Sequence, residues 1–207
     1  TLAVSKLSAT QLASLDSTQL QALTTAHATT LSALQVANLT SEQVSKLEAE
    51  DMAKLSTGVI AALTDAQLDG LTAQQVTDLS TTQIAALSTA QVNLGLTANQ
   101  VSQGLSTSQI AALTTAGIAA LSTAQVDALS SAQLANGLTT TQVGALTTDG
   151  IRTLGNDISG SIYKKQTLLG TAQIAALTTA QVVALTTDQV GVLTTDQVGS
   201  LTTAQLA

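Results

Sequence analysis

The chain has 207 residues, a net charge of −7 and only six Lys or Arg residues, and this acidic balance argues against nucleic-acid binding. It contains no Cys, Pro, Trp or Phe, and one residue each of Tyr, Met and His. Zero Cys excludes disulfides and thiolate metal sites, and a single His argues against a catalytic triad or a His-rich metal site. With 44% apolar residues the chain is too hydrophobic to be disordered, so we expect a core of Leu, Ile, Val and Ala.

Leu recurs at a fixed spacing along almost the whole chain. It returns every eight residues from Leu7 to Leu87, and the grid continues to Leu154 and then from Leu169 to Leu201, which makes 24 octads with Leu as position one. Three steps take nine residues, and each carries a Gly directly before the new Leu: Gly95, Gly104 and Gly137. Because Gly tolerates positive φ, we expect one extra residue to bulge out between units at these points.

The octad consensus reads L-[S/T]-T-A-Q-[I/V/L]-A-A, and LSTTQIAA from Leu79 is a good example. Position two is Ser, Thr or Asp in 21 octads, position five is Gln in 18, and position six is apolar and larger than Ala in 22. This is the pattern of a helix start. The hydroxyl is the N-cap, the Gln three residues later completes a capping box, and positions one and six form a hydrophobic staple. Each octad is therefore predicted to begin its own short helix.

The predicted fold is all-α: a tight α-solenoid of one- to two-turn helices, one per octad. Such helices are unstable alone, so positions one and six should stack into one continuous core and the Thr at position three should be exposed. A continuous helix is disfavoured because eight residues leave the Leu positions offset by about 80° around its axis. A β-solenoid remains the alternative, although Ala and Gln are poor strand formers.

In chain order, we expect an octad-repeat solenoid over residues 1–154, an irregular break over 155–168 and further octads over 169–207, all in one continuous repeat domain. The break contains Tyr163, Lys164 and Lys165 and follows Arg152, the only Arg of the chain. We interpret these four residues as a candidate contact loop for a partner or a neighbouring subunit. The alternative is a decayed repeat in which Ile162 stands in for the missing Leu.

Two other octads depart from the consensus. Glu48, Glu50 and Asp51 suggest a weak Ca²⁺ site, but they lack the alternating acidic ligands and the Gly of a Ca²⁺ loop, so a solvated charged face is the better interpretation. His27 occupies the slot that is Gln in most octads and is expected to substitute for it. We predict no catalytic, cofactor-binding or metal site, and no enzymatic activity, because no motif sets an acid, base or nucleophile apart from the repeat.

The ends of the sequence fall within octads. Val4 fills position six of a unit whose Leu would precede residue 1, and Leu206 fills the same position in the last unit. We expect a processed product or a piece of a longer array, with apolar stacking surface at both ends. Different exposed surfaces on opposite ends make a heterologous contact, which propagates into open filaments. No apolar run approaches the roughly 18 residues of a spanning helix, so we predict no membrane insertion.

The run L-[S/T]-[S/T]-x-Q-[I/V]-x-A-L resembles the octad arrays of very large secreted or surface-exposed bacterial proteins that are labelled adhesin-like or haem-utilisation-like. The resemblance covers nearly the whole chain apart from residues 155–168, and it implies an extracellular or cell-surface location. A haem function is not supported, because the candidate axial ligands His27 and Met52 both occupy regular octad positions.

Two functions follow as hypotheses from the repeat and the resemblance. The first is a non-catalytic structural protein that self-assembles into an extracellular filament, sheath or surface layer. Its principal partner would be further copies of itself, joined through solenoid ends and lateral contacts. The second is the stalk or ligand-presenting region of a bacterial surface adhesin, with cell-surface or matrix components as partners.

Overall fold

The computed structural model describes residues 4–154 and 169–206, and every regular element in them is a short helix. These residues fall into two compact units, Thr1–Leu105 and Ser106–Ala207. The boundary lies within the regular repeat. The expected all-α solenoid is confirmed, and the β-solenoid alternative is wrong, because the described residues contain no strand.

The helices follow the octads one by one. In the first unit they are η1 (Val4–Lys6), α1 (Ala9–Ala13), α2 (Ser17–Gln21), α3 (Thr25–Ala28), α4 (Ala33–Ala37), α5 (Ser41–Ser45), α6 (Ala49–Met52), α7 (Thr57–Ala61), α8 (Asp65–Asp69), α9 (Ala73–Asp78), α10 (Thr81–Ala85), η2 (Gln91–Gly95) and η3 (Gln100–Gly104). In the second unit they are α11 (Thr107–Ala112), α12 (Thr115–Ala120), α13 (Thr123–Ala128), η4 (Gln133–Gly137), α14 (Thr140–Ala145), α15 (Thr148–Thr153), α16 (Thr171–Ala175), α17 (Thr179–Ala184), α18 (Thr187–Gly191) and α19 (Thr195–Gly199).

The capping box predicted from the consensus starts most of these helices, and α10 shows its geometry. Ser80 is the N-cap in an extended conformation, with φ −68° and ψ 158°. Its hydroxyl accepts the backbone N–H of Gln83 at 3.2 Å, and the Gln83 Oε1 accepts the backbone N–H of Ser80 at 2.7 Å. The helix ends after five residues, and Leu87 and the next cap lead into the following octad. The expected local structure of the octad is confirmed.

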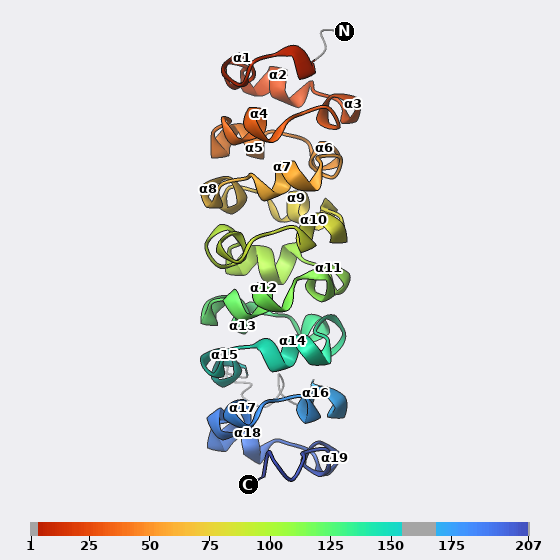
Figure 1. The fold of residues 1–207 in the computed structure, drawn as a ribbon, viewed down its shortest axis with the longest axis vertical. Helices are drawn as coiled ribbons and strands as arrows, with labels where there is room; N and C mark the ends of the chain where they lie inside the picture. Colours follow the sequence, from red (N-terminus) through yellow and green to blue (C-terminus); the bar gives the residue numbers. More distant parts are fainter. Residues whose placement is uncertain (1–3, 155–168, 207) are drawn as a thin grey trace. The chain divides into compact units, whose positions relative to one another are not determined.

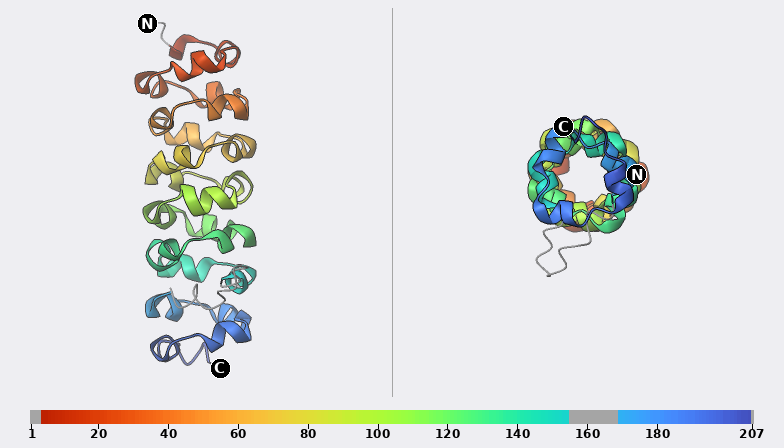
Figure 2. Two further views of the ribbon diagram at one scale, coloured as in Figure 1. Left: turned by 180° about the vertical axis from the view of Figure 1, so that it is seen from behind. Right: turned by 90° about the horizontal axis from the view of Figure 1, so that it is seen from below.

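Successive helices wind into coils in each unit, so that a helix packs against the helix of the third octad further along. In the first unit α1 packs on α4 and α4 on α7, and in the second unit α13 packs on α15 (Figure 1). The view from behind shows the same winding within each unit (Figure 2). One full coil of the chain therefore takes three to four octads.

The core of each unit consists of positions one and six. Within the second unit, for example, Leu121 is 4% exposed and Ile118 is 1% exposed. The Thr residues at position three, such as Thr81 and Thr115, lie exposed on the outside of the coil. Both expectations from the octad pattern are confirmed.

The nine-residue octads differ from the expectation. The extra residue is absorbed inside the helix as a π-turn: the Leu96 N–H bonds to the Gln91 carbonyl, five residues back, at 3.1 Å, and η3 and η4 close in the same way. None of the three glycines has a positive φ. A Cβ at Gly95 would lie 3.0 Å from the Leu68 Cβ on the neighbouring coil, closer than ordinary van der Waals contact, so Gly favours this close approach. The Gly thus permits close packing of a wider helix, and the predicted bulge between units is wrong.

Replacement of Leu121 by Ala should lower the free energy of unfolding by about 2–5 kcal/mol, because a buried Leu side chain leaves a cavity between coils. Leu185→Ala is the matched comparison, since this Leu occupies the same octad position but is only half-buried. Leu185→Ala should lower the free energy of unfolding by clearly less than Leu121→Ala does. Urea denaturation followed by circular dichroism measures both values, and equal losses would contradict the assignment of Leu121 to the core of the second unit.

Candidate interaction site

The Gln at position five makes a second set of contacts that the capping box does not require. In Gln83, whose side chain is 2% exposed, Oε1 is used by the N-cap while Nε2 donates to two backbone carbonyls of the preceding coil. These are the carbonyls of Met52 at 3.0 Å and Leu55 at 2.8 Å. A side-chain amide offers two donors and one carbonyl acceptor, and here all of them are used. We call this contact the amide clamp.

The amide clamp recurs between the same octad positions, and the separation in residues is larger where a nine-residue octad or the irregular break intervenes. Gln67 bonds to Val36 and Leu39, which lie 31 and 28 residues earlier at positions six and one of their octads. The shorter distance, 28 residues, equals three and a half octads and defines one coil. Further amide clamps of this kind are made by Gln35, Gln75, Gln91, Gln100, Gln142, Gln173, Gln181 and Gln189.

The register also accounts for the residues on either side of the irregular break. Gln189 bonds to the carbonyls of Ile151 and Leu154, and Leu154 lies 35 residues earlier, seven more than in a regular coil. The bonds pair the octads as though Leu154 and Leu169 began consecutive octads. Ile162, the candidate first residue of a decayed octad, lies outside the described residues.

The candidate contact loop can be placed only in part. Tyr163, Lys164 and Lys165 lie outside the described residues. Arg152 is on α15, where its Nε donates to the Ala184 carbonyl at 3.2 Å and its guanidinium pairs with Asp149 at 3.3 Å. Arg152 therefore links α15 to the helix packed against it. Its role in binding a partner stays a prediction.

His27 replaces Gln in the capping box as expected. Its Nδ1 accepts the backbone N–H of Thr24 at 3.2 Å, and its own backbone N–H donates to the Thr24 hydroxyl at 3.4 Å. Met52 fills position six of its octad and is fully buried in the core. Both residues thus perform the ordinary tasks of their octad positions.

The acidic octad contains an unusual buried group. Glu48 and Glu50 are exposed, in agreement with a solvated charged face, but Asp51 is only 3% exposed and this part of the expectation is wrong. Asp51 occupies position five, and its Oδ2 has no hydrogen-bond partner within the described residues. Burial raises the pKa of the Asp51 carboxyl above its usual value of 3.8, and the charges of Glu48 and Glu50 raise it further. The sequence could have indicated the burial of Asp51, because Asp51 occupies position five, which is Gln in most octads.

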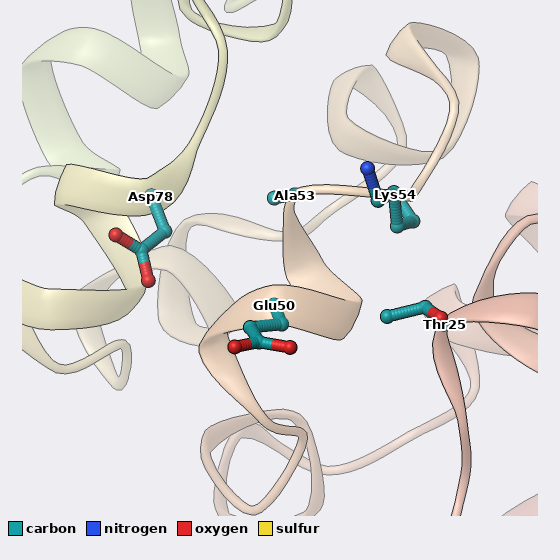
Figure 3. Close-up of a pocket in the computed structure, with 5 residues that line it drawn as sticks. All are labelled: Thr25, Glu50, Ala53, Lys54 and Asp78. Carbon is teal, nitrogen blue, oxygen red and sulfur yellow. The ribbon is translucent and has the colours of Figure 1, made fainter.

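A pocket of about 300 Å³ lies beside this octad (Figure 3). Its walls come from α3, from α6 with the residues that follow it, and from α9. The lining residues are Thr25, Glu50, Ala53, Lys54 and Asp78. Within the described residues, no three His, Cys, Asp or Glu side chains converge in a way that could hold a metal ion.

The first and last described coils present two different faces. In the last coil, Val190, Val198 and Leu206 at position six are 52%, 45% and 64% exposed, whereas their counterpart Val143 is fully buried. In the first coil, the exposed Gln11 and Gln19 complete capping boxes through Oε1. Their Nε2 groups donate to no backbone carbonyl of the described residues. The last coil thus exposes apolar side chains, and the first coil exposes amide donors.

A family model described as the ALTTAQ repeat matches residues 44–81, 103–136 and 168–203, which together are 108 of the 207 residues. The chain belongs to the ALTTAQ repeat family. The six letters stand in full at residues 176–181, where they run from the end of one octad through the N-cap to the clamping Gln181 of the next. No curated protein and no solved structure matches the chain. None of the described helices of this ALTTAQ repeat protein has the length and apolarity needed to cross a membrane.

Gln83→Glu separates the two tasks of the ALTTAQ glutamine. A Glu side chain still accepts the N-cap N–H, but it cannot donate to the carbonyls of Met52 and Leu55 and places a buried charge against them. We expect a loss of at least about 3 kcal/mol in the free energy of unfolding at neutral pH.

Gln11→Glu is the matched control for this variant, because Gln11 has the same capping box and no clamp. It should change the free energy of unfolding by less than about 0.5 kcal/mol, as for other exposed sites. Both values come from urea denaturation. Similar losses in the two variants would show that capping alone accounts for the Gln.

Proposed function

We propose that this ALTTAQ repeat chain is a non-catalytic structural protein that assembles end to end through the contact that joins its own coils. The observation that carries the proposal is the direction of the amide clamp, in which Gln Nε2 of the later coil donates to backbone carbonyls of the earlier coil. A second copy is the occupant that fits the last coil, because the first coil of the same chain carries the amide donors that this face lacks.

The coil contact is directional, which favours growth over closure into a dimer. In every amide clamp the later coil donates through Gln Nε2 and the earlier coil accepts through its backbone carbonyls, as in Gln67 with Val36 and Leu39. The two surfaces of a coil are therefore different, and copies join head to tail. A head-to-tail contact that does not close into a ring continues into a filament. The low content of charged residues, 9%, opposes this association only weakly.

The side chains of the repeat are occupied in ways that suit a structural role. Position two caps, position five clamps, and positions one and six fill the core, so most polar groups of an octad already have structural partners. An extracellular filament, sheath or surface layer is the setting that we propose for the assembly, in line with the resemblance of the octads to arrays in bacterial surface proteins.

The assembly is tested by placing charge on the apolar face of the last coil. Val198→Glu should weaken self-association, because the carboxylate would be buried against the next copy. Val183→Glu is the control: Val183 is 79% exposed and occupies position seven of its octad, outside the core positions. It should leave association unchanged. Sedimentation velocity over a range of concentrations, with electron micrographs of the largest species, measures the effect.

The opposite face provides an independent arm of the test. Gln11→Glu combined with Gln19→Glu removes the amide donors from the first coil and should weaken association to a similar degree, with an unchanged circular dichroism spectrum. If the unmodified chain stays monomeric at all concentrations, or if both charged faces leave association intact, the proposal is wrong. A monomer of this kind would favour the alternative of an adhesin stalk.

A further inference from the structure

The amide clamp is interrupted at two consecutive octads of the first unit. Gln43 and Gln67 clamp on either side, but position five is Asp51 in one intervening octad and Val59 in the other. By the register of 31 and 28 residues, the carbonyls that a Gln at position 51 would meet are those of Leu20 and Leu23. Asp51 thus stands at the position where, in other octads, a Gln amide joins the helix to the preceding coil.

The chemistry of this slot depends on the protonation of Asp51. An ionised carboxylate only accepts hydrogen bonds, and so do the backbone carbonyls of the preceding coil. A protonated carboxyl has one O–H donor, so it can replace one of the two donations that a Gln amide makes to the preceding coil. Oδ2 of Asp51 is buried and has no hydrogen-bond donor among the described residues, so no hydrogen bond there compensates the charge of an ionised carboxylate at this oxygen.

The charged groups around Asp51 favour the protonated form. Glu48 and Glu50 flank it on its own element, and Lys54 follows. Of the two helices packed against α6, α3 contributes His27 and α9 contributes Asp78. Burial is the largest cause of the raised pKa, the two glutamates add to it, and only the charge of His27 acts against them.

We propose that Asp51 is a proton-operated clamp, which in its protonated form donates to the Leu20 or Leu23 carbonyl and closes α6 onto the preceding coil, and in its ionised form releases that bond. Because Val59 offers no amide in the next octad, the release loosens a defined stretch between the clamps of Gln43 and Gln67. The same chain therefore has a rigid first unit in mildly acidic solution and a locally open one at higher pH.

The direction of the pH effect follows from linkage. The pKa of Asp51 is higher in the folded chain than its ordinary value of 3.8, so the folded state holds this proton more tightly than the unfolded state. The stabilisation is complete below the ordinary value and is lost as the pH rises through the pKa of the folded state.

Backbone hydrogen exchange measured by mass spectrometry tests the clamp. After correction for the intrinsic exchange rate, protection of peptides over residues 17–31 and 47–61 should fall as pH rises above 4, by up to about tenfold per pH unit, the limit for one proton. Peptides elsewhere in the first unit should keep their protection. Asp51→Asn supplies a donor at every pH and should abolish the dependence. Asp51→Gln, which rebuilds the consensus octad, should do the same.

Two control variants assign the titration to Asp51. Asp78→Asn removes the nearby carboxylate of α9, and His27→Gln removes the imidazole of α3 while it keeps the capping box; both should retain a pH-dependent loss of protection in the two segments. The proposal is overturned if the unmodified chain shows no such loss, if Asp51→Asn and Asp51→Gln show it undiminished, or if a control variant abolishes it.

Discussion

A helix of five residues leaves almost all of its backbone N–H and C=O groups without partners inside the helix, and the structure depends on how these groups are satisfied. The hydroxyl at position two satisfies one N–H, and the glutamine at position five satisfies the N-cap N–H. Through its Nε2, that glutamine also bonds to two carbonyls of the preceding coil, as Gln83 does with Met52 and Leu55. One side chain therefore both begins a helix and attaches it to its neighbour. Helices too short to persist alone thereby become stable in a stack.

The amide clamp also sets the register, which an apolar stack alone would define less strictly. Layers of Leu and Val can slide past one another, whereas a buried amide has to find its carbonyls. Irregularities of the chain are accommodated so that this pairing is kept. A nine-residue octad widens its helix into a π-turn, as in η2, and the clamp of Gln189 reaches Leu154 although seven additional residues intervene. Where Asp51 replaces the amide, a buried carboxylate oxygen has no donor in the part of the chain that the structure describes.

The polarity of the clamp connects the fold with the function that we propose. Because donors always lie on the later coil and acceptors on the earlier one, a coil has two different surfaces and can be extended in one sense only. The interactions that hold coils together within a chain are then chemically the same as those that would join copies. Under this proposal, the repeat would need no separate interface to form a fibre.

The sequence by itself determined the local structure of this protein. Leu at position one, a hydroxyl at position two and Gln at position five predicted a capped short helix in each octad, because capping and stapling involve residues only a few positions apart. The identity of the core positions followed from the same pattern. His27 could be predicted as a substitute for Gln for this reason, since a ring nitrogen three residues after the N-cap can accept the same N–H.

Only the tertiary structure shows which backbone carbonyls the Gln at position five contacts, for example the Leu39 carbonyl 28 residues before Gln67. The number of octads in a coil depends on how helices pack in three dimensions, and no local pattern encodes it. The second task of the glutamine, the close approach of Leu68 to Gly95, and the burial of Asp51 all arise across the boundary between coils. Each of these residues occupies a recognisable octad position. The groups that it contacts, however, belong to a distant part of the chain.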